Sequence, residues 1–92
     1  MIMKKTIITV LGQDTVGIIA KVCTCLANNN INILDITQTI TGGYFNMMMI
    51  TDAGAAVKDM GAVSDELAQL GREMGLEIRC MQEDIFNAMH RV

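Results

Sequence analysis

The spacing of apolar residues alternates between two patterns along this chain, and that alternation constrains the fold more than any other feature. Strand-like segments, the first of them rich in β-branched residues, cover 5–11, 31–41, 44–51 and 76–81, and segments with helical spacing cover 16–28 and 58–74. Two interleaved strand–helix–strand units are typical of a ferredoxin-like βαββαβ sandwich, a four-stranded antiparallel sheet with both helices on one face. We therefore predict this α+β fold as a single domain over 1–92, in which 83–92 form a short C-terminal helix.

Turn and capping residues mark the boundaries of these segments. Gly42 and Gly43 predict a hairpin turn between the second and third strands, because glycine adopts positive φ without steric cost. Asp14 and Thr15 are both good N-caps for the first helix. The run of asparagines over 28–30 is expected to end that helix, since asparagine tolerates a left-handed conformation.

The spacing also assigns side chains to faces. The predicted apolar face of the first helix contains Ile19, Cys23, Leu26 and Ala27. The apolar stripe of the second contains Met60, Val63, Leu67, Leu70 and Met74. Alternation in the second strand groups Leu34, Ile36, Gln38 and Ile40 on one face, and Ile33, Asp35, Thr37 and Thr39 on the other. This last face is half polar, so we expect it to meet solvent or a partner.

Composition excludes several classes of partner. Ten acidic and seven basic residues give a net charge of −3, whereas nucleic-acid binding needs clustered Lys and Arg. No apolar run approaches the roughly 20 residues of a transmembrane helix, and Lys4 and Lys5 interrupt the stretch where a signal peptide is apolar. We expect a cytoplasmic protein that binds neither nucleic acid nor membranes. Hydrophobic residues make up 51%, more than one small core needs, which predicts a homodimer or higher homo-oligomer.

The cysteines and the single histidine form no recognisable metal or catalytic motif. Cys23 and Cys25 would point about 200° apart on a helix. Cys80 and His90 lie in other segments, whereas a metal site needs three or four converging ligands. We therefore predict buried, unreactive thiols, no metal, no cofactor and no catalytic residue.

The loop after the first strand separates the functions that this fold hosts. RNA-recognition modules need exposed aromatic residues beside basic ones, acylphosphatase-like enzymes need a cation in this loop, and heavy-metal domains need two cysteines there. Residues 12–15 hold no cation and no cysteine, and only 3% of the chain is aromatic. Gly12 and Gly17 instead allow close approach to the main chain, where free helix N–H groups bind carboxylates. From the residues alone, Asp14 as a simple helix cap and the loop as an anion site both stay open.

The same loop and the strand after the first helix resemble a known family. The residues are Gly12-Gln-Asp-Thr-Val-Gly-Ile-Ile-Ala20, then Val22, then Leu26-Ala27, then Asn32-Ile-Leu-Asp-Ile-Thr-Gln38. This pattern is similar to the ACT domain, and most resembles the ACT modules of the glycine-cleavage transcriptional repressor and of formyltetrahydrofolate deformylase. The whole chain, its C-terminal tail included, resembles an uncharacterised group of stand-alone bacterial ACT proteins.

The resemblance implies a non-enzymatic regulatory module that binds a small metabolite, usually an amino acid, between subunits. The implied loop positions are Gly12, Gln13, Asp14, Val16, Gly17 and Ile18, and those in the second strand of a neighbouring chain are Asn32, Ile33 and Leu34. Loop N–H groups would hold the α-carboxylate, and Asp14 or Asn32 the ammonium group. Many ACT loops have proline at the position of Val16, so this loop lacks proline's fixed φ. The alternative function is a ligand-independent interaction module that acts on a transcription factor or a metabolic enzyme.

Overall fold

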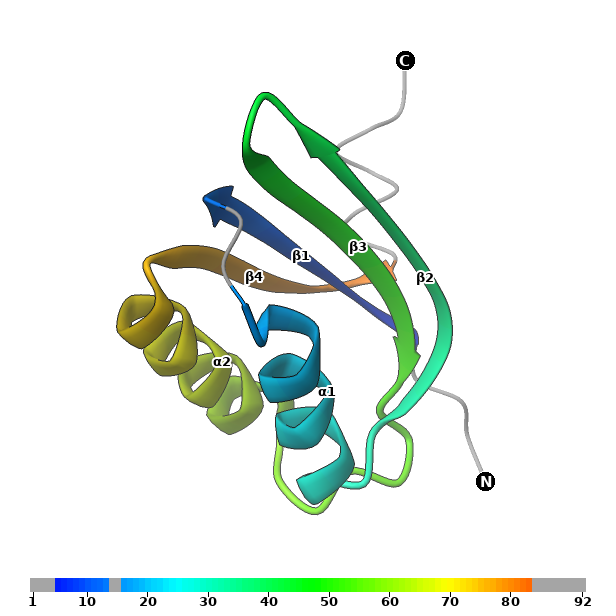
Figure 1. Cartoon of the computed structure of the whole chain (residues 1–92). Helices are drawn as coiled ribbons and strands as arrows, with labels where there is room; N and C mark the ends of the chain where they lie inside the picture. The colour runs from blue at the N-terminus through cyan, green and yellow to red at the C-terminus, as the bar shows by residue number, and fades with distance from the viewer. Residues whose placement is uncertain (1–4, 14–15, 84–92) are drawn as a thin grey trace.

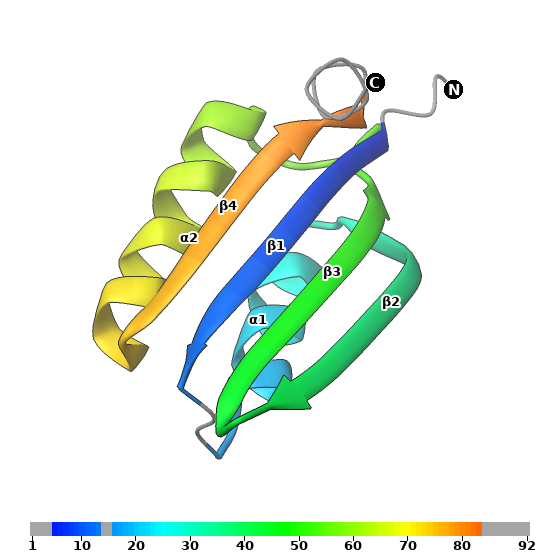
Figure 2. The same cartoon turned by 90° about the horizontal axis from the view of Figure 1, so that it is seen from above.

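A computed structural model describes residues 5–13 and 16–83, which form two layers (Figure 1). The elements follow in the order β1 (Lys5–Gln13), α1 (Ile18–Asn28), β2 (Asn32–Thr41), β3 (Tyr44–Asp52), α2 (Met60–Met74) and β4 (Leu76–Gln82). The strands form one antiparallel sheet of order β2-β3-β1-β4, and both helices cover the same face of it (Figure 2). The predicted ferredoxin-like fold is confirmed. The predicted helix over 83–92 lies, apart from Glu83, outside the described residues.

The core fills the space between the sheet and the helices. Its fully buried side chains come from the two central strands and from both helices, and include Ile8, Val10, Met47, Met49, Val22, Leu26, Val63 and Leu67. Met48 lies between two of these methionines but is exposed on the opposite face of the sheet. The methionine run therefore contributes to the core at alternate positions only, as a strand requires.

Helix α1 turns a different face to the core than the sequence pattern predicts. Its buried residues are Ile18, Val22 and Leu26, whereas Ile19 is 37% exposed and Ala27 is exposed. Both sets have helical spacing, so periodicity alone does not separate them. The predicted face was wrong except at Leu26.

Helix α2 packs closely on β4. Asp59 caps its start by accepting a hydrogen bond from the backbone N–H of Ala62 at 2.8 Å, and Gly75 ends it with a φ of 71°. Val63 and Leu67 of the predicted stripe are fully buried. A Cβ atom on Gly71 would lie only 2.7 Å from a backbone oxygen of β4, so the helix backbone itself contacts the strand at that point.

Strand β2 does not alternate strictly, because it contains a β-bulge. Ile33 lies opposite Thr51 and Asp35 opposite Ile50, so Leu34 is an extra residue. Thr51 is buried on the helix side of the sheet, and Ile33 shares that face because cross-strand partners point the same way. The prediction that grouped Ile33 with Asp35 was therefore wrong.

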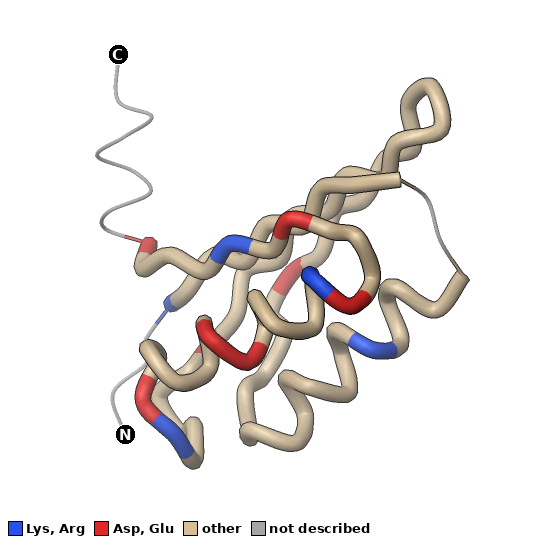
Figure 3. The backbone as a smooth tube through the Cα atoms, turned by 90° about the vertical axis from the view of Figure 1, so that its left-hand side faces the viewer, with Lys and Arg blue, Asp and Glu red and all other residues tan. Residues whose placement is uncertain are grey.

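Strand β2 is also an exposed edge strand, and Asp35 is its one charged residue. Every residue from Leu34 to Thr41 is exposed, with Ile36 at 42% and Ile40 at 60%. Residues 36–51 contain no charged side chain, and the hairpin of β2 and β3 is uncharged over most of its length (Figure 3). Natural edge strands are usually blocked by Lys, Pro or a covering segment. This edge has neither residue, so it is available for pairing with another strand.

Candidate ligand-binding site

The first half of the predicted site is the loop between β1 and α1. Gly12 packs against the start of β4, where a Cβ atom on it would lie 2.6 Å from a leucine methyl group. Gln13 ends β1 and is exposed. Val16 is 97% exposed, whereas Ile18 is buried and anchors the first turn of α1 in the core. Asp14 lies outside the described residues.

Gly17 is the N-cap residue of α1. Its φ of 90° and ψ of 4° are left-handed, a conformation that residues other than glycine rarely adopt. The prediction that Asp14 or Thr15 occupies this position was therefore wrong. No described side chain accepts a capping hydrogen bond at the start of α1. N–H groups of a first helical turn have no partner within the helix, so they can bind water or an anion.

The second half of the predicted site is the start of β2. Asn32 is exposed and lines a hollow of about 420 Å³ together with Ala27, Asn30, Ile31, Asp52 and Ala55. Ile33 is half-buried and Leu34 is exposed at the bulge. Of the three predicted strand positions, Asn32 lines this hollow.

The two halves lie at opposite ends of the sheet within one chain. Gln13 is opposite Tyr44 in β3, and Asn32 is opposite Asp52 of the same strand. These two β3 residues are eight positions apart, which corresponds to roughly 27 Å at about 3.3 Å per residue. The structure therefore brings together Gly12, Gln13, Val16, Gly17 and Ile18 in one group, and Asn32, Ile33 and Leu34 in another.

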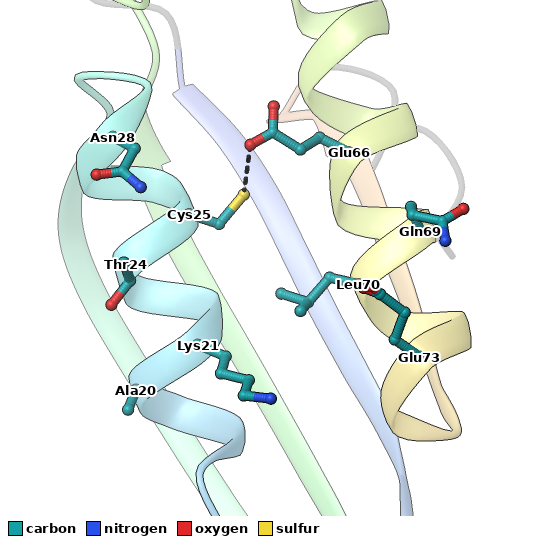
Figure 4. Close-up of a pocket in the computed structure, with 9 residues that line it drawn as sticks. All are labelled: Ala20, Lys21, Thr24, Cys25, Asn28, Glu66, Gln69, Leu70 and Glu73. Atoms are coloured by element: carbon teal, nitrogen blue, oxygen red, sulfur yellow. Dashed lines mark hydrogen bonds between the residues drawn. The ribbon is translucent and has the colours of Figure 1, made fainter.

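A hydrogen-bonded cluster that the sequence patterns missed joins α1 to α2. Glu66 Oε1 accepts a hydrogen bond from Cys25 Sγ at 3.3 Å (Figure 4). The same oxygen accepts from Asn29 Nδ2 at 3.3 Å, and Glu66 Oε2 accepts from Lys58 Nζ at 2.6 Å. Asn29 is buried and also donates to the backbone oxygen of Cys25 at 2.8 Å. In the sequence Asn29 reads only as a helix-ending residue, but it follows Leu26 by three positions and so continues the buried stripe.

These contacts shift the pKa values of the cluster. The Lys58 ammonium group, followed by Cys25 and Asn29, lowers the pKa of Glu66. Burial, followed by the hydrogen bond to Glu66, raises the pKa of Cys25 to about 11. Burial alone raises the pKa of Cys80 to about 11. Both thiols are protonated at neutral pH, which makes them weak nucleophiles and weak metal ligands.

The variant Glu66→Gln is expected to melt at a lower temperature than the parent near pH 7, with a difference that disappears at low pH. Because the pKa of Glu66 is lowered on folding, its ionised form stabilises the fold above the ordinary glutamate value of about 4.3, and this stabilisation is lost as pH falls through the folded value. Melting curves by circular dichroism at pH values on either side of about 4.3 measure this. Glu73→Gln, an exposed change on the same helix, is the control and should show no such convergence. If the Tm of Glu66→Gln stays below that of the parent at low pH, the stabilisation does not come from the ionised Glu66 carboxylate.

The described part of the chain contains no group of three or more His, Cys, Asp and Glu side chains placed to hold a metal ion. Its helices are also too short or too polar to cross a bilayer.

Comparison with protein families connects the loop and the strand to one known domain. The family model of the ACT domain matches residues 4–81, which include every predicted ligand position. The chain belongs to the ACT domain family. This confirms the resemblance that the loop and the Asn32 segment indicate in the sequence.

Close relatives of this ACT domain match it over its whole length. A UPF0237 protein of Bifidobacterium longum is 60% identical over 90 residues, which cover 98% of this chain and 100% of the relative. The solved structure of an ACT domain protein from Streptococcus pneumoniae is 34% identical, with a TM-score of 0.80, and the match covers 95% of this chain and 98% of that one.

Two larger proteins share the fold over part of their length. A formyltetrahydrofolate deformylase from Pseudomonas syringae matches 87% of this chain with 28% of its own, at a TM-score of 0.80 and 23% identity. A protein assigned as a glycine cleavage system transcriptional repressor matches 89% of this chain with 47% of its own, at a TM-score of 0.78 and 22% identity. These likenesses concern the fold, and they agree with the two ACT modules that the sequence resembles.

Proposed function

We propose that this ACT domain is a non-enzymatic regulatory module that binds a small metabolite, an amino acid, at a site shared between two copies of the chain. The observation that carries the proposal is the separation of the two halves of the site. The loop and Asn32 are both accessible but lie roughly 27 Å apart in one chain. A ligand of amino-acid size that contacts both halves must therefore sit between two chains.

Antiparallel pairing of β2 with the β2 strand of a second copy would complete the site. Such pairing sets the Asn32 end of one strand beside the Thr41 end of the other. Thr41 and Gln13 are both opposite Tyr44, so the loop lies at the Thr41 end of the sheet. The loop of one chain and Asn32 of the second copy would then share one end of a continuous sheet. The exposed edge of β2, which has no charged residue from Ile36 to Thr41, supports this arrangement.

The chemistry of the two halves suits a zwitterion. N–H groups at the start of a helix such as α1 attract a carboxylate. The hollow at the start of β2 offers the side-chain oxygen of Asn32 and the negative charge of Asp52, both of which suit an ammonium group. The volume of about 420 Å³ is sufficient for an amino acid with its water shell.

The thiols support the non-enzymatic part of the proposal. The raised pKa values of Cys25 and Cys80 make both poor nucleophiles at neutral pH. All three cysteines are free, which fits the reducing cytoplasm as the proposed location.

Thermal melting in the presence of each of the twenty amino acids tests the proposal. A ligand at about 100 times its Kd adds about 2.7 kcal/mol, which corresponds to a rise of several degrees in a domain this small. We expect one amino acid, or a few of similar shape, to raise the Tm of the parent. Asn32→Ala should abolish the rise, because it removes the polar side chain of the second half.

Asn28→Ala is the matched control, because Asn28 is also exposed but does not line the hollow. It should keep the full rise in Tm. The proposed site is ruled out if no amino acid raises the Tm, or if the rise in Tm persists in Asn32→Ala. The absence of any rise with all twenty amino acids would favour the ligand-independent interaction module instead.

A further inference from the structure

The face of the sheet that is turned away from both helices is buried at one end and exposed at the other (Figure 2). Ile8 and Val10 of the central strand β1 point into the core, so Ile7 and Leu11 point to the opposite face. Ile7 is 5% exposed, whereas Leu11 is 49% exposed. Both have cross-strand neighbours in β3 and in β4, so their places in the sheet are equivalent. The difference in exposure therefore requires a cover over the Ile7 end of this face.

Ile7 is the centre of an apolar row that crosses three strands. Its cross-strand partners are Ile50 in β3 and Met81 in β4, and direct partners point to the same face. Both partners are half-buried. We call these three residues the Ile7 row. At the other end of the face, Leu11 lies beside Glu77 and lines a hollow of about 330 Å³. The Ile7 row is therefore the part of this face that gains most from being covered.

The described part of the chain ends beside the Ile7 row. The end of β4 lies next to the start of β1 (Figure 2). Glu83, which follows β4, has its Oε2 atom 4.0 Å from Nζ of Lys5. Lys5 is two positions before Ile7 in the same strand and so shares its face. The segment that comes next, residues 84–92, therefore starts at the end of the face where Ile7 is buried.

Residues 84–92 lie outside the described part of the chain, but their sequence suits the Ile7 row. Ile85, Phe86 and Met89 have helical spacing and share one side of a helix. Asp84 is in the first turn, where an acidic side chain favours helix formation. A helix of these nine residues is about 13 Å long, and three neighbouring strands span about 10 Å. The segment is therefore long enough to cross from β4 over β1 to β3.

We propose that residues 84–92 form a helix whose apolar side packs on the Ile7 row of the same chain. A helix of this length reaches across the strands at one end of the sheet only, which accounts for the burial of Ile7 and the exposure of Leu11. The helix also keeps the Ile7 row from contact with a second sheet, which favours association of two copies through the edge of β2. The proposal uses neither the loop nor Asn32, so it stands or falls independently of the amino-acid site.

Nuclear Overhauser effects (NOEs) between aromatic rings and methyl groups of the full-length chain test the proposal. The aromatic residues of the chain are Tyr44, Phe45 and Phe86. Phe45 is in the core on the helix side of the sheet. Tyr44 is opposite Gln13, which is six positions or roughly 20 Å along β1 from Ile7. An NOE between an aromatic ring and the Ile7 methyl groups therefore identifies Phe86, and we expect to observe it.

An equal mixture of ¹³C-labelled and unlabelled chains shows whether the contact lies within one chain. A spectrum that selects contacts between labelled and unlabelled chains should contain no NOE between Phe86 and Ile7. If the NOE appears in that spectrum, a second copy supplies the covering segment and the proposal is wrong. The proposal is equally wrong if the uniformly labelled chain gives no NOE between these two residues.

Thermal melting of full-length variants gives an independent measurement. Phe86→Ala should lower the Tm by at least about 4 °C, because the truncation removes apolar contacts with the Ile7 row. Asn87→Ala is the matched control, since Asn87 lies on the opposite side of the predicted helix. Its Tm should stay within about 1 °C of the parent value. An unchanged Tm for Phe86→Ala would contradict the docking of this segment.

Discussion

The double variant Ile36→Lys/Ile40→Lys is expected to sediment as a monomer at a protein concentration at which the parent chain sediments as a dimer. Both side chains are exposed on the edge strand β2, at 42% and 60%, so the fold of the single chain should survive. In an antiparallel β2 pair the four new ammonium groups of two copies face one another along one edge. Like charges across an interface cost several kcal/mol, which weakens association by orders of magnitude.

Sedimentation velocity measures this directly, and Val57→Lys is the control. Val57 is 66% exposed in the segment before α2 and is not part of β2, so a lysine there should leave the dimer intact. The double variant should also lose the amino-acid rise in Tm although Asn32 is unchanged, because the shared site needs two chains. A monomeric parent, or a variant that stays dimeric, contradicts pairing through β2.

Leu67→Ala is expected to lower the free energy of unfolding by about 3–4 kcal/mol. Leu67 is fully buried between α2 and the sheet, so truncation removes apolar contacts and leaves a cavity that its neighbours fill only in part. Against a total stability of about 5–15 kcal/mol, this is the largest single-site loss that we expect.

Urea unfolding followed by circular dichroism gives the number, with Leu70→Ala as the matched control. Leu70 lies on the same helix three positions later and is half-buried, so its truncation should cost only about 1 kcal/mol. Equal losses in the free energy of unfolding for the two variants would contradict a larger contribution of Leu67 than of Leu70 to the core.

The topology was predictable because each element carries its own local signal. β-branched segments, the Gly42-Gly43 turn and the stripe of Val63 and Leu67 all indicate the same arrangement. The buried face of each helix was harder to predict. Helix α1 has two stripes of apolar residues with helical spacing, and only packing against the sheet determines that the stripe with Ile18 and Val22 is buried. The bulge at Leu34 has no local signal either, since it depends on the register with β3.

The candidate site was predictable in its residues but not in its geometry. The family pattern marks the loop and Asn32, yet their separation follows from the pairing of both with β3. The capping prediction failed because Asp14 and Thr15 are good N-caps by residue type, whereas the left-handed turn at Gly17 sets where α1 begins. The cluster of Cys25, Asn29 and Glu66 joins two helices distant in sequence, so no local pattern predicts it.

The central position of β1 links the folding of this domain to the completion of its synthesis. β1 is the earliest strand of the domain to be made, but it pairs on one side with β4, where Thr6 lies opposite Gln82. At about 5–20 residues per second, β1 waits several seconds for that partner. Until then the sheet lacks an outer strand and the surface of α2 that packs on it is uncovered. A nascent chain halted before residue 76 therefore exposes one unpaired edge of β1, which makes it a substrate for chaperones and proteases rather than a partly active protein.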